Sequence, residues 1–112
     1  MTESWDNQRA ATRYNLVTLA WYKRIDDRAA DTEEGVARSF DVSEEGAGLV
    51  AAQAIPVGTR ILLQLVIPYG RVTALARVAN SRPVANGAYQ LGLQVYCVPP
   101  PDVATWKRLV GE

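Results

Sequence analysis

The sequence predicts an all-β domain, a small six-stranded antiparallel β-barrel with a short C-terminal α-helix. Three observations lead to this fold class. Short segments of alternating apolar and polar residues recur along the chain, turn residues separate them at regular intervals, and the last residues change to a helical spacing of apolar side chains. The 112 residues are enough for one domain with a single core.

The first predicted strand covers residues 14 to 22, a run rich in β-branched and aromatic side chains. Its alternation gives one apolar face, made by Val17, Leu19 and Trp21, with Thr18 on the other. The connection over residues 23 to 34 is dense in charged side chains. It predicts a solvated turn or a short exposed helix.

The second and third predicted strands flank a polar turn. Residues 36 to 42 form the second strand, whose end delivers Asp41. Its two alternating sets are Val36, Arg38, Phe40 and Val42 against Ala37, Ser39 and Asp41. After the turn at residues 44 to 46, residues 49 to 54 form a short third strand.

Three further strands complete the predicted barrel. Residues 60 to 67 alternate cleanly after a turn at Val57-Gly58, and residues 71 to 79 follow them. Asn86-Gly87 signals a hairpin before the last strand. The side chains expected to share the inner faces are Ile61, Leu63, Leu65 and Ile67, then Val72, Ala74, Ala76 and Val78, and finally Tyr89, Leu91, Leu93 and Val95.

A short helix is predicted over residues 102 to 110. Three consecutive prolines stop the last strand, and Asp102 stands where an N-cap residue is expected. The apolar side chains that follow form one stripe: Val103, Trp106, Leu109 and Val110. A helix this short is not stable alone, so it should pack across an open end of the barrel.

Charge is balanced overall but unevenly distributed. Lys and Arg number 12, as do Asp and Glu, so nothing favours a long polyanion such as duplex DNA and no nucleic-acid partner is expected. Acidic residues concentrate in residues 26 to 45, and none occurs between Gly46 and Pro101. Part of the surface should therefore be basic, which favours a small anionic ligand.

Composition argues against several other classes of protein. The absence of His removes the commonest general base and the commonest metal ligand, so we expect neither an enzyme nor a metal site. The single Cys97 excludes an internal disulfide and fits a reducing compartment. No signal peptide or membrane-spanning run is recognisable, so we expect a cytoplasmic protein that does not insert into membranes.

Two polar stretches form the candidate site, Arg9-x-x-x-Arg13 and Asp41-x-Ser43-x-x-Gly46. Arginine forks can contact phosphate or the O6 and N7 atoms of guanine, and a carboxylate such as Asp41 can accept hydrogen bonds from N1–H and N2–H. Ser43 can bond a phosphate or the exocyclic amine, and Gly46 allows close approach of the backbone. Together these groups fit a guanine nucleotide with its phosphates.

Each stretch also has a purely structural interpretation. Both arginines belong to a loosely held polar arm, residues 1 to 13, and Arg24 and Arg28 have the same spacing with two aspartates inside that would repel phosphate. Asp, Ser and Gly are common in tight turns, where side-chain oxygens accept backbone N–H groups and Gly supplies a positive φ. The occurrence of both stretches in this order, ahead of an alternating barrel, favours the ligand interpretation.

On these residues the chain resembles the PilZ domain, a small six-stranded barrel that serves bacteria as a receptor for cyclic di-GMP and carries the motifs RxxxR and [D/N]xSxxG. The matching segments are RAATR at 9 to 13, DVSEEG at 41 to 46 continuing through Ala47-Gly48-Leu49, the turn at Val57-Gly58, and Leu91-Gly92-Leu93. The resemblance covers most of the chain. It implies that the barrel domain spans residues 14 to 112 and follows the arm.

The resemblance also implies a role for each motif residue. Arg9 and Arg13 would grip phosphate and the guanine Hoogsteen edge, and the second motif, Asp41, Ser43 and Gly46, would seat guanine on the barrel. Some members carry a further arginine before RxxxR that goes with a stacked ligand dimer. Gln8 occupies that position here, which implies a single ligand.

The function implied by the resemblance is that of a cyclic di-GMP receptor without a cofactor. Binding would order the arm and present a new surface to a downstream protein of a motility, pilus or exopolysaccharide machinery. One alternative is a PilZ-type adaptor that works through protein contacts without nucleotide. Another is a barrel that binds single-stranded RNA through Arg71 and Arg77, which would need exposed stacking aromatics such as Tyr69 and Tyr96.

Overall fold

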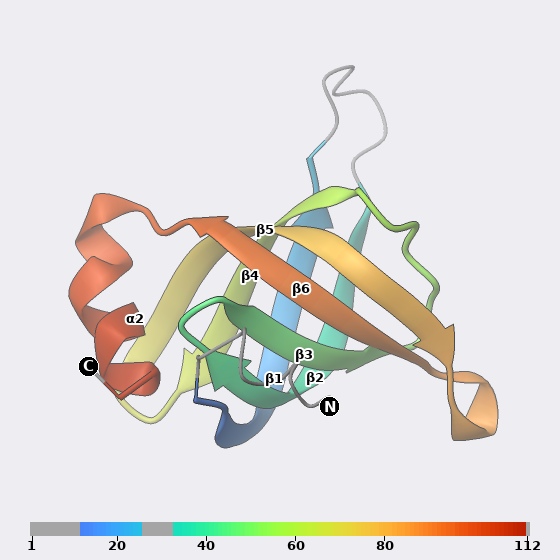
Figure 1. Cartoon of the computed structure of the whole chain (residues 1–112), viewed down its shortest axis with the longest axis horizontal. Coiled ribbons are helices and arrows are strands. Elements are labelled where there is room, and N and C mark those ends of the chain that lie inside the picture. The colour runs from blue at the N-terminus through green and yellow to red at the C-terminus, as the bar shows by residue number, and fades with distance from the viewer. Residues whose placement is uncertain (1–11, 26–32, 112) are drawn as a thin grey trace, which may run out of the picture.

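The computed structural model describes residues 12–25 and 33–111. They form a closed antiparallel barrel in the strand order β1-β2-β3-β6-β5-β4, which confirms the predicted fold class (Figure 1). The strands are β1 Tyr14–Arg24, β2 Glu34–Ser43, β3 Gly46–Ala51, β4 Arg60–Ile67, β5 Gly70–Pro83 and β6 Tyr89–Cys97. Residues 26 to 32, in the connection predicted to be a turn or a short helix, lie outside the described residues.

The inner faces of β4, β5 and β6 make the core that their alternation predicts. The buried side chains are Ile61, Leu63, Leu65 and Ile67 on β4, Val72, Ala74, Ala76 and Val78 on β5, and Leu91 and Leu93 on β6. Tyr89 and Val95, near the ends of β6, are half-buried and pack against this cluster. Burial of apolar surface stabilises a fold by about 25 cal/mol per Å², so these three strands carry much of the stability.

The apolar face of Val17, Leu19 and Trp21 on β1 points to solvent and not to the core. Val17 and Leu19 are 69% and 55% exposed, whereas Ala20 and Tyr22 on the opposite face are buried. Both faces of this strand are rich in apolar groups. Alternation therefore identifies the strand but does not decide which face turns inward.

A bulge in β2 interrupts the single alternation predicted for residues 36 to 42. Ala37 and Ser39 are buried in the first part of the strand, but Val42 and Ser43 are buried in the second. The register against β3 shifts between Ser39 and Asp41. An extra residue in one strand turns the following side chains to the other face, so the bulge decides where Asp41 points.

The C-terminal helix packs at one end of the barrel, beyond the end of β6 (Figure 1). A 3₁₀ turn, η2 (Pro100–Asp102), leads into α2 (Val103–Leu109), and Trp106 and Val110 join the core cluster. The Asp102 side chain does not cap the helix, contrary to the prediction. Its Oδ2 accepts a hydrogen bond of 2.9 Å from the Thr73 backbone N–H on β5 and so ties the helix to the barrel.

Another 3₁₀ turn, η1 (Ala85–Gly87), connects β5 and β6 at the predicted hairpin. Asn86 and Gly87 both have positive φ, 65° and 74°, which explains the residue choice. Within the described ranges, no helix has both the length and the apolar character needed to cross a membrane.

Candidate functional site

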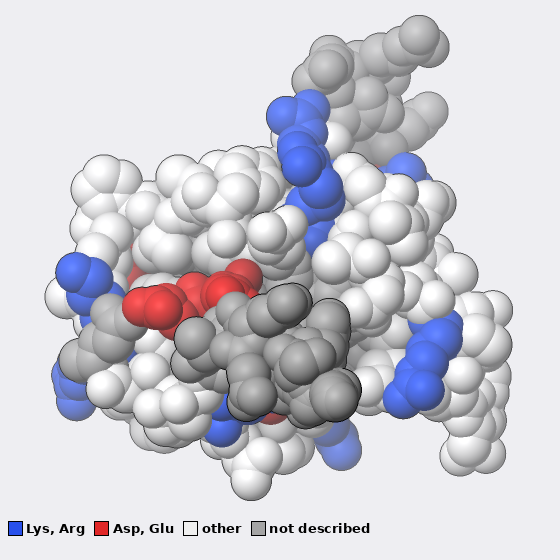
Figure 2. Space-filling model, viewed as in Figure 1, with Lys and Arg blue, Asp and Glu red and all other residues white. Residues whose placement is uncertain are grey.

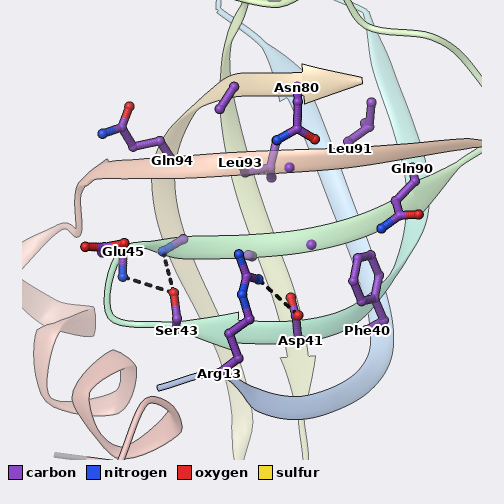
Figure 3. Close-up of a pocket in the computed structure, with 15 residues that line it drawn as sticks. Arg13, Phe40, Asp41, Ser43, Glu45, Asn80, Gln90, Leu91, Leu93 and Gln94 are labelled. Atoms are coloured by element: carbon purple, nitrogen blue, oxygen red, sulfur yellow. Dashed lines mark hydrogen bonds and ion pairs between the residues drawn. The ribbon is translucent and has the colours of Figure 1, made fainter. Parts of the chain in front are cut away.

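A hollow of about 500 Å³ lies on the outside of the barrel, where β2, β3 and β6 are neighbours (Figure 3). Its volume falls within the range of roughly 300 to 1,000 Å³ typical of small-molecule sites. The predicted site residues that line it are Arg13, Asp41, Ser43 and Gly46. Arg9 lies outside the described residues.

Two glycines lie in the floor of this hollow. Gly48 on β3 lies opposite Gly92 on β6. A Cβ on Gly48 would lie 2.3 Å from the Phe40 ring, and a Cβ on Gly92 would lie 2.6 Å from the Asn80 side-chain amide. Glycine in a strand interior often marks the close approach of a ligand or another backbone. The Phe40 ring and the Asn80 amide thus lie directly over the backbone at these two glycines, in the space that a side chain would otherwise occupy.

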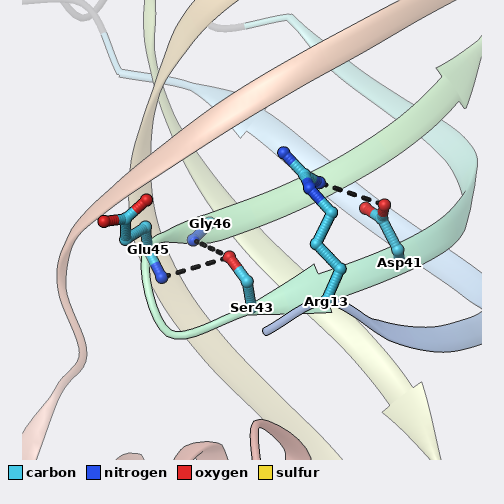
Figure 4. A network of polar contacts seen from close by, with 5 residues as sticks. All are labelled: Arg13, Asp41, Ser43, Glu45 and Gly46. Carbon is cyan, nitrogen blue, oxygen red and sulfur yellow. Dashed lines mark hydrogen bonds and ion pairs between the residues drawn. The ribbon is translucent and has the colours of Figure 1, made fainter. Parts of the chain in front are cut away.

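The pairing of β1 with β2 brings the two motifs together. Asn15 near the start of β1 lies opposite Asp41 on β2, and Arg13, two residues before Asn15, reaches Asp41 with its long side chain. Arg13 Nη1 donates a hydrogen bond of 3.0 Å to Asp41 Oδ2, and the two side chains form an ion pair (Figure 4). Residues 28 positions apart in the sequence thus meet at one edge of the hollow.

The Asp41 carboxylate has an unused acceptor. Its side chain is 15% exposed, against 48% for Arg13, and its Oδ1 is buried and accepts no hydrogen bond from any described residue. A buried unsatisfied acceptor costs about 1 to 3 kcal/mol, whereas a partly exposed ion pair contributes only about 0 to 1 kcal/mol. Asp41 is therefore suited to accept hydrogen bonds from a ligand.

Ser43 and Gly46 shape the turn between β2 and β3. Ser43 is 1% exposed, and its Oγ accepts hydrogen bonds of 3.2 Å from the backbone N–H groups of Glu45 and Gly46 (Figure 4). These bonds match the structural interpretation of the motif. The hydroxyl keeps its own hydrogen, which a ligand oxygen could accept.

Gly46 is required by packing and not by its backbone dihedral angle. It does not adopt a positive φ, but a Cβ at this position would lie 1.8 Å from the carbonyl oxygen of Leu93 on β6. The strand predicted over residues 49 to 54 in fact begins here. Gly46 thus allows β3 to pair with β6 from its first residue.

Sequence reasoning gave no role to several polar side chains of the hollow. Gln90 and Gln94 lie on either side of Gly92 along β6, and Asn80 reaches in from β5 (Figure 3). Their amides can donate and accept hydrogen bonds. The sequence did contain one indication of their role: Gly92 lies inside a predicted strand, with the amides of Gln90 and Gln94 two positions before and after it.

The face shown in Figure 2 is not predominantly basic. An acidic cluster lies on it, and the Lys and Arg side chains are dispersed around its periphery. The predicted concentration of positive charge is therefore not found on this face.

The two tyrosines named for the RNA alternative, Tyr69 and Tyr96, are each about half exposed. The Cζ atom of Arg108 lies 4.5 Å from the centre of the Tyr69 ring, and the Cζ atom of Arg77 lies 5.9 Å from the centre of the Tyr96 ring.

Comparison of the chain with known proteins gives matches among solved structures alone. No protein-family model matches the sequence, and no curated protein matches it. The PilZ domain of YcgR from Escherichia coli with c-di-GMP has a TM-score of 0.69 and 19% identity, covering 92% of this chain and 88% of that one. The chain has the PilZ-domain fold.

Two further structures share this fold. The PilZ domain of CeSA from a cellulose-synthesizing bacterium has a TM-score of 0.61 and 14% identity, covering 88% of this chain and 94% of that one. The MrkH–c-di-GMP complex of K. pneumonia has a TM-score of 0.62 and 18% identity, covering 89% of this chain and 48% of that one. This chain therefore spans about half the length of MrkH. At these identities the likeness shows the fold alone.

Proposed function

We propose that this chain is a non-catalytic receptor for cyclic di-GMP. The observation that carries the proposal is the Asp41 carboxylate, whose buried Oδ1 lacks a hydrogen bond from the described residues and lies beside Arg13 at the glycine floor. Guanine carries two adjacent N–H donors for such a carboxylate, and acceptors O6 and N7 for an arginine fork. Structural neighbours that are described with this ligand support the choice of nucleotide.

In the proposed complex, the Phe40 and Asn80 side chains turn away from Gly48 and Gly92, and guanine takes their place over these backbones and donates N1–H and N2–H to Asp41. Arg13 turns from Asp41 to the Hoogsteen edge or to a phosphate, and Arg9 joins it from the arm. Leaving the ion pair costs about 0 to 1 kcal/mol because Arg13 is half exposed. A bidentate arginine–guanine contact is worth about 1 to 3 kcal/mol, so the exchange favours the bound state.

The ligand would act as a switch by ordering the arm. Recruitment of Arg9 and Arg13 folds residues 1 to 13 over the hollow and creates a surface for a downstream protein. Hydrogen exchange tests this step, because residues 1 to 13 should gain protection at saturating ligand. Unchanged exchange in the arm alongside saturable binding would remove the switch and leave the receptor.

Isothermal titration of cyclic di-GMP tests the receptor itself. We expect saturable binding of one ligand to the wild type, no binding of GTP at the same concentrations, and a loss of roughly five- to 150-fold in affinity for Arg13→Ala. Arg24→Ala is a matched control, because Arg24 forms a similar partly exposed ion pair with Glu33 at 2.9 Å near the other end of β1. Absence of heat and of any thermal shift would favour the nucleotide-independent adaptor instead.

A further inference from the structure

The outside of β1 carries an apolar surface that the proposed receptor does not use. We call it the β1 face, and its apolar members lie on β1 and on the two strands beside it: Val17, Leu19, Trp21, Val36 and Val66. Val36 on β2 is 59% exposed and Val66 on β4 is 38% exposed. All but Val17 line a hollow of about 500 Å³. Contiguous exposed apolar groups of this kind mark interaction sites on soluble proteins.

At one end of the β1 face a cation and a carboxylate are neighbours. Lys23 on β1 lies opposite Glu34 on β2. The Glu34 carboxylate also accepts a hydrogen bond of 3.1 Å from Trp21 Nε1, which holds it at this end. The two opposite charges offset each other, so this end adds no net charge to the face.

The other end of the β1 face carries two arginines on either side of two apolar residues. Exposed Arg38 on β2 lies opposite Leu19, and exposed Arg71 on β5 lies opposite Val66. Leu19 and Val66 are the next residues beyond the last β1–β4 pair, so they are neighbours too. Across the strands β2-β1-β4-β5 the row therefore reads Arg38, Leu19, Val66, Arg71. It spans three strand spacings, roughly 14 Å.

The two arginines of this row are not neutralised by the rest of the described chain. Neither forms an ion pair with a described residue. Asp102, beside β5, directs its Oδ2 at the Thr73 backbone N–H. On the outward side of β4 and β5, beyond the end with Lys23, the next charged side chains are again cations, Arg60 opposite Arg77. The β1 face and its surroundings therefore hold more cations than carboxylates.

A surface that is apolar and cationic at once favours one kind of partner. A second copy of this chain would bring two cationic faces together, which like charges oppose. An anionic membrane would meet the Glu34 carboxylate, and a flat lipid surface would leave the hollow unfilled. An amphipathic helix can place apolar side chains in the hollow and carboxylates on the two arginines.

We propose that the β1 face binds an amphipathic helix of a partner protein, through an apolar stripe with a carboxylate at either end. Two residues eleven positions apart lie on the same side of an α-helix about 16 Å from each other. This separation is close to the span of the arginine row, and the long side chains of Arg38 and Arg71 cover the difference. Each guanidinium can hold a carboxylate through two N–H groups, while the apolar stripe packs on Leu19 and Val66.

The proposed helix leaves the candidate nucleotide site accessible. Around the barrel, β1 is separated from β6 by two strands in either direction, so the β1 face and the floor at Gly92 lie on opposite walls. Helix binding should therefore not depend on cyclic di-GMP. Each proposal can fail without the other, because one is measured with a peptide and the other with the nucleotide.

Fluorescence anisotropy with a synthetic helical peptide tests the proposal. The probe is about 20 residues long and has a leucine stripe between two glutamates placed eleven positions apart. We expect saturable binding to the wild type and a loss of roughly ten-fold or more in affinity for Arg71→Glu, because like charges then meet. Arg82→Glu is the matched control, since it makes the same change on the same strand, but Arg82 bonds Gln90 at the nucleotide hollow. This control should bind the probe as the wild type does.

Two altered peptides distinguish the proposed contact from general adhesion. A peptide of the same composition with both glutamates on the opposite side of the helix should bind the wild type at least about ten-fold more weakly. A peptide with lysines in place of the glutamates should bind the double variant Arg38→Glu/Arg71→Glu and not the wild type. Circular dichroism establishes that each variant is folded.

Three results would overturn the proposal: no saturable binding of the probe, equal binding of the peptide with displaced glutamates, or an affinity insensitive to Arg71→Glu. The other occupants are tested alongside it. Co-sedimentation with phosphatidylserine vesicles, without binding of the probe, would assign the face to a membrane. Self-association in sedimentation equilibrium that Arg71→Glu abolishes, again without binding of the probe, would assign it to a second copy of the chain.

Discussion

Outside β3 and β6 the barrel presents glycine and amide groups, whereas outside β1, on the opposite wall, it presents valine, leucine and tryptophan. Gly48 and Gly92 face each other at the first wall, and the Phe40 and Asn80 side chains lie over their strand backbones. Val17 and Leu19 cover them at the second. Both walls follow the same antiparallel pairing, so the outward residues alone make one wall suitable for a polar ligand and the other for an apolar partner.

The two walls also differ in how their residues affect the stability of the fold. The polar wall keeps a buried acceptor on Asp41 without a hydrogen bond from the described residues, and it tolerates no side chain at Gly46. The apolar wall has its large groups in solvent, where they contribute little to folding. Substitutions at Asp41, Ser43 and Gly46 should therefore change the free energy of unfolding more than substitutions of the exposed residues at the second wall.

The largest effect is expected for Gly46→Ala. The new Cβ would lie 1.8 Å from the Leu93 carbonyl oxygen, a backbone atom that cannot move without separating β3 from β6. We expect a loss of about 3 kcal/mol in the free energy of unfolding, measured by urea denaturation. Gly92→Ala is the control, since it meets only the end of the Asn80 side chain, and should cost less than about 1 kcal/mol. Similar losses for both variants would contradict the packing account.

Ser43→Ala should have the next largest effect. The substitution removes the acceptor for two backbone N–H groups in the β2–β3 turn, at Glu45 and Gly46. We expect a loss of about 1 to 2 kcal/mol in the free energy of unfolding, by thermal and urea denaturation. Ser81→Ala, at a partly exposed position on β5, should stay within about 0.5 kcal/mol. An unchanged Ser43→Ala protein would mean that the turn does not depend on this hydroxyl.

Asp41→Ala should stabilise the ligand-free protein while abolishing the proposed binding of cyclic di-GMP. It removes a buried oxygen whose lack of a hydrogen bond costs about 1 to 3 kcal/mol. It also removes the ion pair with Arg13, which contributes about 0 to 1 kcal/mol. We expect the free energy of unfolding, measured by urea denaturation, to rise by about 1 kcal/mol. Residues kept for binding often lower the stability of the fold in this way. Glu33→Ala, which breaks the exposed Arg24–Glu33 pair, should leave both properties unchanged. A destabilised Asp41→Ala protein would show that the carboxylate serves the fold.

The smallest effect is expected for Val17→Thr on the apolar wall. Val17 is 69% exposed, so exchanging a methyl group for a hydroxyl should change the free energy of unfolding by less than about 0.5 kcal/mol. Val78→Thr makes the same change at a fully buried position on β5 and should cost about 1 to 3 kcal/mol. Equal costs, measured in dilute protein by urea denaturation, would remove the contrast between exposed and core positions.

The sequence predicted the parts of the fold that depend on neighbouring residues. The strand at Arg60–Ile67 and its buried face follow from strict alternation, and the hairpin follows from Asn86-Gly87. The two motifs were also recognisable from residue types and order. They named Arg13 and Asp41, which the structure brings together as an ion pair.

Other features depend on contacts between residues far apart in the sequence. Asp102 has the position of an N-cap residue, but its side chain accepts a hydrogen bond from the Thr73 backbone N–H on β5. Ser39, expected to alternate with its neighbours, accepts a hydrogen bond of 3.2 Å from the Thr18 backbone N–H, beside the shift in register between Asn15 and Thr18. Neither partner can be identified from local pattern alone.

By itself, then, the sequence determined the six strands and the C-terminal helix, the core faces of β4, β5 and β6, and the identity of the motif residues. The tertiary structure alone decided which face of β1 meets solvent, where the β2 bulge aims Asp41, and that Gly48 lies opposite Gly92. The physical reason is that alternation has a period of two residues, so a single bulge or a shift of one residue in register reverses every side chain that follows. Such shifts are set by pairing between strands, which no local pattern records.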